Sequence, residues 1–187
     1  MGMAEDVLDD LRKRIAKTLD DLRRELAKVR TGRANPALLE GVRVDYYGQM
    51  SPLNNVSNVT VADPRLIVIK PWEKSMIPVI EKAINAAGLG VNAQSDAEVV
   101  RVPIPPLTEE RRKEYVKLVR HKAEEARVAI RNVRRDEIHR VDQMQKQGDI
   151  PEGEAKRAHA RFQKVTETQV ARVDALATRK ETEVMEV

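Results

Sequence analysis

The chain has 187 residues and a formal net charge of +4, with 34% charged residues, 3% aromatic residues and no cysteine. Without cysteine, neither a disulfide framework nor a thiolate metal site is possible, and no apolar run reaches the ~20 residues that a membrane span needs. The high charge and low aromatic content favour helical packing with a large surface over a compact globule. We therefore expect a soluble, cytoplasmic protein with no membrane partner.

An amphipathic helix is predicted at the start of the chain, from Asp6 to Arg30. Apolar residues recur there at every third or fourth position, which is the spacing of one helix face. The stretch RTGRANP (30–36) ends this helix, because Gly32 and Pro36 both break helices. The apolar stripe consists of Leu8, Leu11, Ile15, Leu19, Leu22, Leu26 and Val29.

Short strands punctuated by glycine and proline are predicted over residues 37–105. GVRVDYYG (41–48) alternates apolar and polar residues, which is typical of a half-buried strand. Two further β-branched runs lie in NNVSNVTVADPRLIVIKPW (54–72), separated by an Asp-Pro turn. Helical spacing returns in SMIPVIEKAINAAGLG (75–90), and a hairpin is predicted in VNAQSDAEVVRVPI (91–104). The pattern indicates a small β/α/β domain.

Two long helices are predicted after the proline-rich crossing VPIPP (102–106). Thr108 is a good N-cap residue, and Glu109 and Glu110 complement the helix dipole, so the second helix begins here and continues to about Gln147. After a turn at GDIP, a third helix continues to about residue 185. On its apolar side we expect Phe162, Val165, Val173 and Leu176.

These elements predict an α+β fold of two domains. Residues 1–30 and 107–187 form an elongated antiparallel three-helix bundle, and residues 31–106 form an inserted small β/α/β domain. The two short chain crossings between the domains permit a hinge, because few contacts need to cross such a boundary. The expected hinge residues are Thr31, Gly32, Pro103, Pro105 and Pro106.

Positive charge is concentrated on the second long helix. Residues 111–135 include 10 basic and 3 acidic residues. Helical spacing predicts that its buried stripe consists of Val119, Ala123, Ala126, Ile130 and Val133. About a quarter-turn away lies a strip of exposed cations, which we call the basic strip: Lys113, Arg120, Arg127, Arg131 and Arg134, with Arg135 next to it.

The basic strip has two possible interpretations. Its last three arginines have no acidic partner within the strip at helical spacing, so we expect it not to be self-neutralised. Arginine also has a planar guanidinium that suits phosphate. The residues alone leave both a solvated helix flank and a surface for RNA or another polyanion open. Sequence-specific base reading is disfavoured, since the chain offers no aromatic platform.

No group of residues points to catalysis. The histidines are His121, His139 and His159, and no two of them stand at the spacing of metal ligands. The sequence also has no glycine-rich phosphate loop, nucleophile elbow or zinc signature. We expect no enzymatic activity, no catalytic residue, no bound metal and no cofactor.

Six short motifs together resemble one known family. They are IRNVRRD (130–136), LTEERRK (107–113), RTGRANP (30–36), VDYYG (44–48), Pro-Leu at 52–53 and IEKAI (80–84). Their order and spacing over essentially the whole chain are similar to those of the bacterial ribosome recycling factor family. The chain departs from the family's usual pattern at Asn92-Ala93 and Asp96-Ala97, both in the inserted domain.

The resemblance implies an L-shaped protein that enters the A-site region of the post-termination ribosome. There, elongation factor G and its GTP hydrolysis would act with it to split the subunits for a new round of translation. We expect a monomer with no DNA partner that contacts large-subunit ribosomal RNA. The residues expected at this contact are Arg30, Gly32, Arg33, Arg127, Arg131, Arg134 and Arg135.

The alternative is a coiled-coil interaction protein, in which the inserted domain binds a partner and the basic flank binds RNA. Salt-sensitive binding to large ribosomal subunits would favour a recycling factor. Self-association without ribosome affinity would favour the coiled-coil protein.

Overall fold

The computed structural model describes residues 2–186, and the chain divides into two compact units. The first unit combines the chain up to Leu26 with Glu114–Glu183, and the second combines Ala27–Lys113 with the chain from Val184 onward. None of the helices in the described part of the chain has the length and apolar character needed to span a membrane. The domain boundaries expected at 30/31 and 106/107 stay a prediction.

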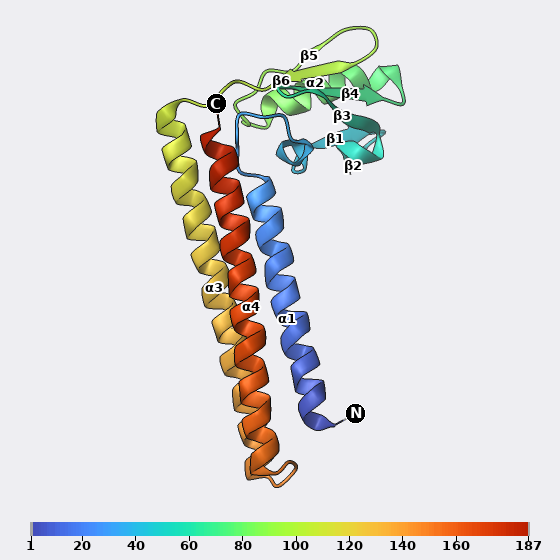
Figure 1. Ribbon diagram of the computed structural model, residues 1–187. Helices are drawn as coiled ribbons and strands as arrows, with labels where there is room; N and C mark the ends of the chain where they lie inside the picture. Colours follow the sequence, from blue (N-terminus) through green and yellow to red (C-terminus); the bar gives the residue numbers. More distant parts are fainter. Residues whose placement is uncertain (1, 187) are drawn as a thin grey trace. The chain divides into compact units, whose positions relative to one another are not determined.

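Three long helices provide the first unit (Figure 1): α1 (Met3–Ala27), α3 (Glu109–Lys146) and α4 (Glu152–Met185). Thr108 caps α3 as predicted, since its Oγ1 accepts a hydrogen bond of 3.2 Å from the backbone N–H of Arg111. α1 ends three residues before the predicted end. At that point the side-chain amide of Asn35 donates a hydrogen bond of 3.2 Å to the carbonyl of Ala27 and satisfies it.

Each long helix buries one apolar stripe, and α3 buries all five of the residues predicted for it. On α4, Phe162 and Val173 are buried as predicted, whereas Val165 and Leu176 are only partly buried. The inward positions beside these two are occupied by Thr166 and Ala177. The full buried set on α4 is Ala155, Ala158, Phe162, Thr166, Val173, Ala177, Lys180 and Val184.

Antiparallel strands form the second unit. A hairpin of β1 (Arg43–Tyr46) and β2 (Gln49–Pro52) stands beside a sheet with the order β3-β4-β6-β5. The strands of this sheet are β3 (Ser57–Asp63), β4 (Leu66–Pro71), β5 (Gln94–Ser95) and β6 (Val100–Pro103). Helix α2 (Ile77–Ala86) and the short 3-10 turns Pro36–Leu39, Leu53–Asn55 and Lys74–Met76 complete the unit.

The core of the second unit lies between α2 and the sheet. Ile67 and Ile69 of β4 pair with Val102 and Val100 of β6, and all four side chains are fully buried. Because side chains alternate along a strand, these residues share one face of the sheet. Ile77, Ile80 and Ile84 of α2 belong to the same buried cluster, as their helical spacing predicted. The expected α+β fold class is therefore confirmed, with long helices and a small antiparallel sheet domain.

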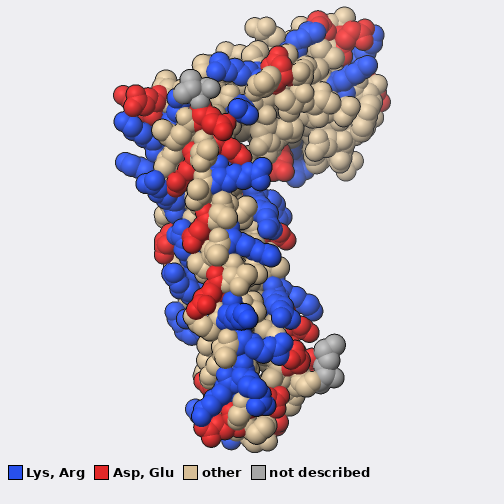
Figure 2. Space-filling view, viewed as in Figure 1, with Lys and Arg blue, Asp and Glu red and all other residues tan. Residues whose placement is uncertain are grey.

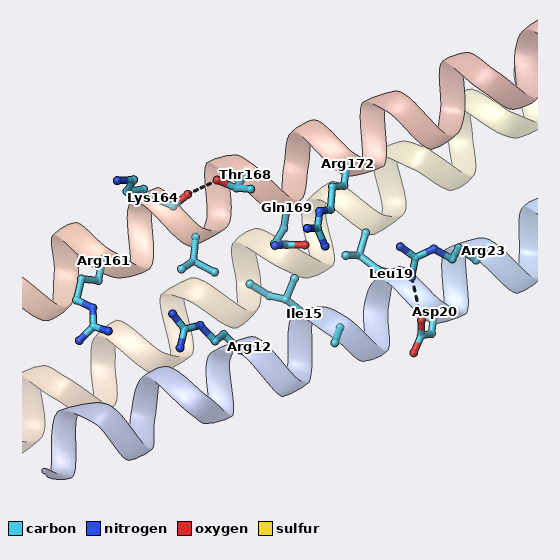
Figure 3. Close-up of a pocket in the computed structure, with 12 residues that line it drawn as sticks. Arg12, Ile15, Leu19, Asp20, Arg23, Arg161, Lys164, Thr168, Gln169 and Arg172 are labelled. Atoms are coloured by element: carbon cyan, nitrogen blue, oxygen red, sulfur yellow. Dashed lines mark hydrogen bonds and ion pairs between the residues drawn. The ribbon is translucent and has the colours of Figure 1, made fainter. Parts of the chain in front are cut away.

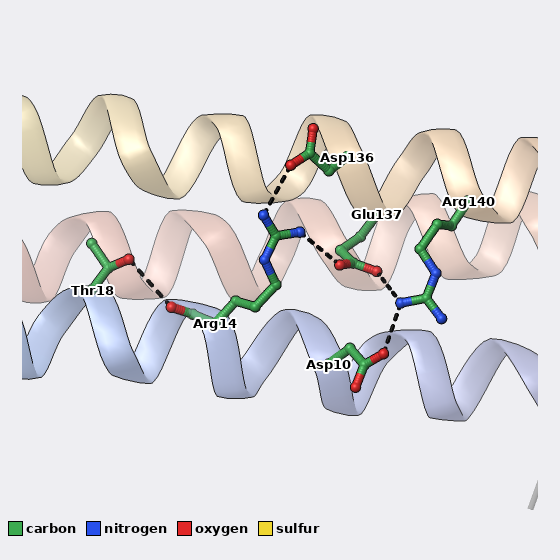
Figure 4. Close-up of polar contacts among 6 residues, drawn as sticks. All are labelled: Asp10, Arg14, Thr18, Asp136, Glu137 and Arg140. Carbon is green, nitrogen blue, oxygen red and sulfur yellow. Dashed lines mark hydrogen bonds and ion pairs between the residues drawn. The ribbon is translucent and has the colours of Figure 1, made fainter.

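A buried carboxylate joins α1 to α3 in the first unit (Figure 4). Glu137 is only 2% exposed, and its two oxygens accept hydrogen bonds of 2.8 Å from Arg14 and from Arg140. Arg14 also donates to Asp136 at 2.9 Å, and Arg140 donates to Asp10 at 2.7 Å. The hydrogen bonds of Arg14 to Asp136 and Glu137 raise the pKa of Arg14, and the bond to Arg140 lowers the pKa of Asp10. Glu137 is thus paired on both sides.

Replacing both Arg14 and Arg140 by Met should destabilise the protein strongly. Glu137 would then be a buried charge without a partner, and breaking such a pair costs about 3 kcal/mol or more. Adding Glu137→Met should restore most of the loss, because an apolar group of similar volume needs no partner. Urea unfolding of the double and triple variants measures both effects. A double variant as stable as the unmodified protein would show that Glu137 does not depend on these arginines.

Candidate nucleic-acid interface

The basic strip lies on α3, beside the buried stripe of the bundle. Figure 2 shows Lys and Arg side chains along the length of the bundle, interrupted by acidic groups. Arg131 and Arg135 are exposed and Arg134 is half-buried, whereas the side chain of Arg127 is only 23% exposed. The arginines of the strip therefore do not share one environment.

The expectation that the strip is not neutralised is wrong for most of its members, since Lys113 pairs with Glu109 at 3.4 Å and Arg131 lies 3.8 Å from Glu124. The closest pairs are those of Arg127 and Arg120. Arg127 donates hydrogen bonds of 2.8 Å to Asp174 and to Glu124, and Arg120 donates one of 2.8 Å to Glu181. The bond to Asp174, together with that to Glu124, raises the pKa of Arg127. Asp174 and Glu181 belong to α4, so residue spacing within α3 could not reveal these pairs. These two arginines hold α3 against α4.

The positive charge that stays accessible lies at Arg131, Arg134 and Arg135. The guanidinium of Arg131 is half exposed, and the carboxylate nearest to it is that of Glu124 at 3.8 Å. Arg134 donates to the neutral amide oxygen of Gln163 on α4. Arg135 is exposed, and no acidic side chain in residues 2–186 forms an ion pair with it. This part of the strip can still bind an anion.

The other predicted contact residues, Arg30, Gly32 and Arg33, belong to the second unit. Arg33 forms an ion pair of 3.1 Å with Glu186, and the guanidinium of Arg30 packs against Gly90. Gly32 has a φ of +79°, a conformation that favours glycine. The structure therefore places the predicted contact residues in two groups, one on α3 of the first unit and one in the second unit.

The predicted hinge residues come together within the second unit. Thr31, Gly32 and Pro106 line one cavity of about 170 Å³. Pro103 ends β6, where it pairs with Leu66 of β4. The side chains of Pro103, Pro105 and Pro106 are exposed. The hinge itself stays a prediction.

A group of basic residues that the sequence did not single out lines a groove between α1 and α4 in the first unit. They are Arg12, Arg23, Arg161, Lys164 and Arg172. Their spacing contains the signal, since Arg161, Lys164 and Arg172 are three and eight residues apart and so lie on one face of a helix. The sequence could not show that α1 forms the other wall of this groove, because this depends on the two helices lying side by side in the fold.

Comparison with known proteins decides the family. The sequence model described as Ribosome recycling factor matches residues 22–185, which is most of the chain. The chain belongs to the ribosome recycling factor family. The ribosome-recycling factor of Anaeromyxobacter sp. (strain K) is 55% identical over 185 residues, which cover 99% of this chain and 98% of the relative. The ribosome-recycling factor of Coxiella burnetii (strain CbuG_Q212) is 48% identical, and the match covers 99% of this chain and 100% of the relative.

Solved structures of the ribosome recycling factor family are also similar to this chain. A solution structure of the ribosome recycling factor has a TM-score of 0.78 and 38% identity, with both chains covered completely. A second match comes from models for the T. thermophilus ribosome recycling factor and the E. coli elongation factor G bound to the E. coli post-termination complex. It has a TM-score of 0.68 and 43% identity, again over both complete chains.

Replacing Gly32 by Ala should destabilise the protein, whereas Gly41→Ala should not. A left-handed conformation costs an L-residue about 1–2 kcal/mol, and the Cβ at position 32 would meet Leu107 only at ordinary contact distance. Gly41 lacks a positive φ and has open space around it, so an alanine there should leave stability unchanged or raise it by up to ~1 kcal/mol. Urea unfolding of the two variants compares them directly. Equal stability of both variants would contradict a required left-handed turn at Gly32.

Proposed function

We propose that this chain recycles ribosomes after termination. It binds the post-termination ribosome in the A-site region and, with elongation factor G and GTP, promotes splitting of the subunits in the cytoplasm. The observation that carries the proposal is the family match over most of the chain. The T. thermophilus relative, at 43% identity, is the subject of models bound to a post-termination complex together with elongation factor G.

The accessible end of the basic strip binds large-subunit ribosomal RNA in this proposal. Arg134 and Arg135 form no ion pair with a described carboxylate, and Arg131 has only a loose one with Glu124 at 3.8 Å. A planar guanidinium binds phosphate with two parallel hydrogen bonds. In this proposal Arg127 contributes less to RNA binding, because its hydrogen-bond donors already bind Asp174 and Glu124. Arg30, Gly32 and Arg33 form a second RNA contact.

The chain supplies binding and movement in this proposal, while the chemistry belongs to its partner. The ribosome recycling factor family consists of translation factors without enzymatic activity, and elongation factor G hydrolyses the GTP. We propose that the protein acts as a monomer. Residues 1–30 and 107–187, together with Gly32 and Arg33 of the linker, would bind the ribosomal RNA. The rest of residues 31–106 would move about the hinge at Thr31, Gly32 and the prolines 103, 105 and 106. Family membership disfavours the alternative of a coiled-coil interaction protein.

Replacing both Arg131 and Arg134 by Ala should weaken binding to large ribosomal subunits and flatten its salt dependence. Each lost phosphate contact removes about 0.7–0.9 from the slope of log K against log salt concentration, so two contacts remove roughly 1.4–1.8. Stability should change by no more than ~0.5 kcal/mol for each substitution, because the side chains are not buried. Sedimentation with purified subunits at several salt concentrations measures the slope.

Arg179→Ala is the matched control, since Arg179 lies on α4 and its side chain is 82% exposed. It should leave the slope unchanged. An equal loss for control and test variants would mean that general positive charge, and not this site, binds the ribosome. Arg134→Lys separates charge from geometry: incomplete rescue supports bidentate phosphate binding, and complete rescue contradicts it.

A further inference from the structure

The groove between α1 and α4 in the first unit has a volume of about 690 Å³ (Figure 3). Its floor consists of apolar side chains from both helices: Ile15, Ala16, Leu19 and Val165. Ile15 and Leu19 are buried, whereas Ala16 is exposed and Val165 is partly exposed. Solvent therefore reaches the apolar floor at Ala16 and Val165.

Both walls of the groove have the same length. On α1 the groove extends from Arg12 to Arg23, and on α4 from Arg161 to Arg172. Eleven residues of α-helix rise about 16 Å, which is three turns. The groove is therefore long and narrow, and an α-helix of three to four turns matches its length.

The rim of the groove is strongly basic. Arg12, Arg23, Arg161, Lys164 and Arg172 line it, against a single acidic residue, Asp20, which forms an ion pair of 3.0 Å with Arg23. Lys164 and Arg172 have no acidic partner among residues 2–186. The rim therefore has more positive charge than the acidic residue of the groove neutralises.

Within residues 2–186, the seam between α1 and α4 has fewer ion pairs between helices than the other two seams of the bundle. The seam between α1 and α3 is closed by ion pairs such as Arg140–Asp10 and Lys122–Glu25, and that between α3 and α4 by pairs such as Arg127–Asp174. Between α1 and α4, the ion pair found in the described residues is Arg161–Glu5, at one end of the groove. Along the rest of this seam, the described residues form no ion pair between α1 and α4, and the α1 cations Arg12 and Arg23 pair with Asp9 and Asp20 on their own helix.

We propose that this groove binds an acidic amphipathic helix of a partner protein. The apolar side of such a helix would cover the floor, with anchors at positions i, i+3, i+4 and i+7. An acidic flank of this helix would meet Lys164 and Arg172, the two rim cations on α4 that have no acidic partner among the described residues. The proposal does not depend on the proposed function, since it needs neither ribosomal RNA nor elongation factor G.

RNA fits this groove less well than an acidic helix does. A phosphate backbone would satisfy the basic rim, but its sugar and phosphate groups would leave the apolar floor uncovered. Bases could cover an apolar floor only by stacking, for which aromatic side chains are the usual platform, and none lines this groove. A helix with one apolar face and two acidic flanks satisfies floor and rim together.

A designed peptide tests the proposal with the complete protein. The probe is a fluorescein-labelled peptide of 14 residues with leucine at positions i, i+3, i+4 and i+7 and glutamate on both flanks. A second peptide has the same composition in an order that leaves no apolar face. Fluorescence anisotropy should show that the first peptide binds at least about tenfold more tightly than the second. Equal binding of both peptides, or binding of neither, would overturn the proposal.

Variants of the groove locate the peptide. Lys164→Glu with Arg172→Glu should weaken the first peptide at least about tenfold, and Ala16→Gln should weaken it by obstructing the floor without changing the charge. The control pair Lys117→Glu with Lys156→Glu makes the same charge change at exposed positions outside the groove, and should alter the affinity less than about twofold. Circular dichroism verifies that all variants keep their helices.

Two outcomes of the variant series would overturn the proposal. If the test and control pairs weakened peptide binding equally, the peptide would be attracted by the net charge of the protein alone and not by the groove. The groove would be a nucleic-acid surface instead if the test pair abolished binding of a labelled 20-nucleotide polyuridine RNA but left peptide binding unchanged.

Discussion

Each long helix of the first unit has only a narrow apolar stripe with which to pack, and the remaining positions are largely charged. With 34% of its residues charged, the chain must either pair these groups between helices or leave them to solvent and partners. The bundle does both. Glu137 lies inside the stripe of α3 and is stabilised there by Arg14 and Arg140, so even the core contains a charge that needs its partners.

The same constraint separates structural from available cations. Arg120 and Arg127 bridge α3 to α4 through carboxylates, and binding RNA with them would require giving up those contacts. Arg131 and Arg135 have no such role, and Arg134 bonds only to a neutral amide. A basic helix face is therefore not uniform, and its contribution to binding depends on which guanidinium groups the fold has already engaged. The family's ribosome-binding role fits the part of the face that is left over.

Features that depend on contacts between residues close in the sequence could be predicted, whereas features that depend on contacts between separate helices could not. The N-cap at Thr108 and the buried stripe of α3 follow from neighbours three or four residues away, and both were predicted. The pair Arg127–Asp174 could not be predicted, because its partners are 47 residues apart and on different helices. Glu137 was missed although it continues the spacing of Val133, since a carboxylate is rarely expected in a core. The groove between α1 and α4 depends on two separate helices and was not foreseen.

The most direct test of the central claim is light scattering of post-termination ribosomes, which falls when the subunits separate. We expect a fall when this chain, elongation factor G and GTP are all present, and none when any one of them is omitted. The ribosome-recycling factor of Coxiella burnetii, which is 48% identical to this chain, is the positive control. Unchanged scattering with this chain, under conditions in which the control splits the subunits, would contradict its assignment as a recycling factor.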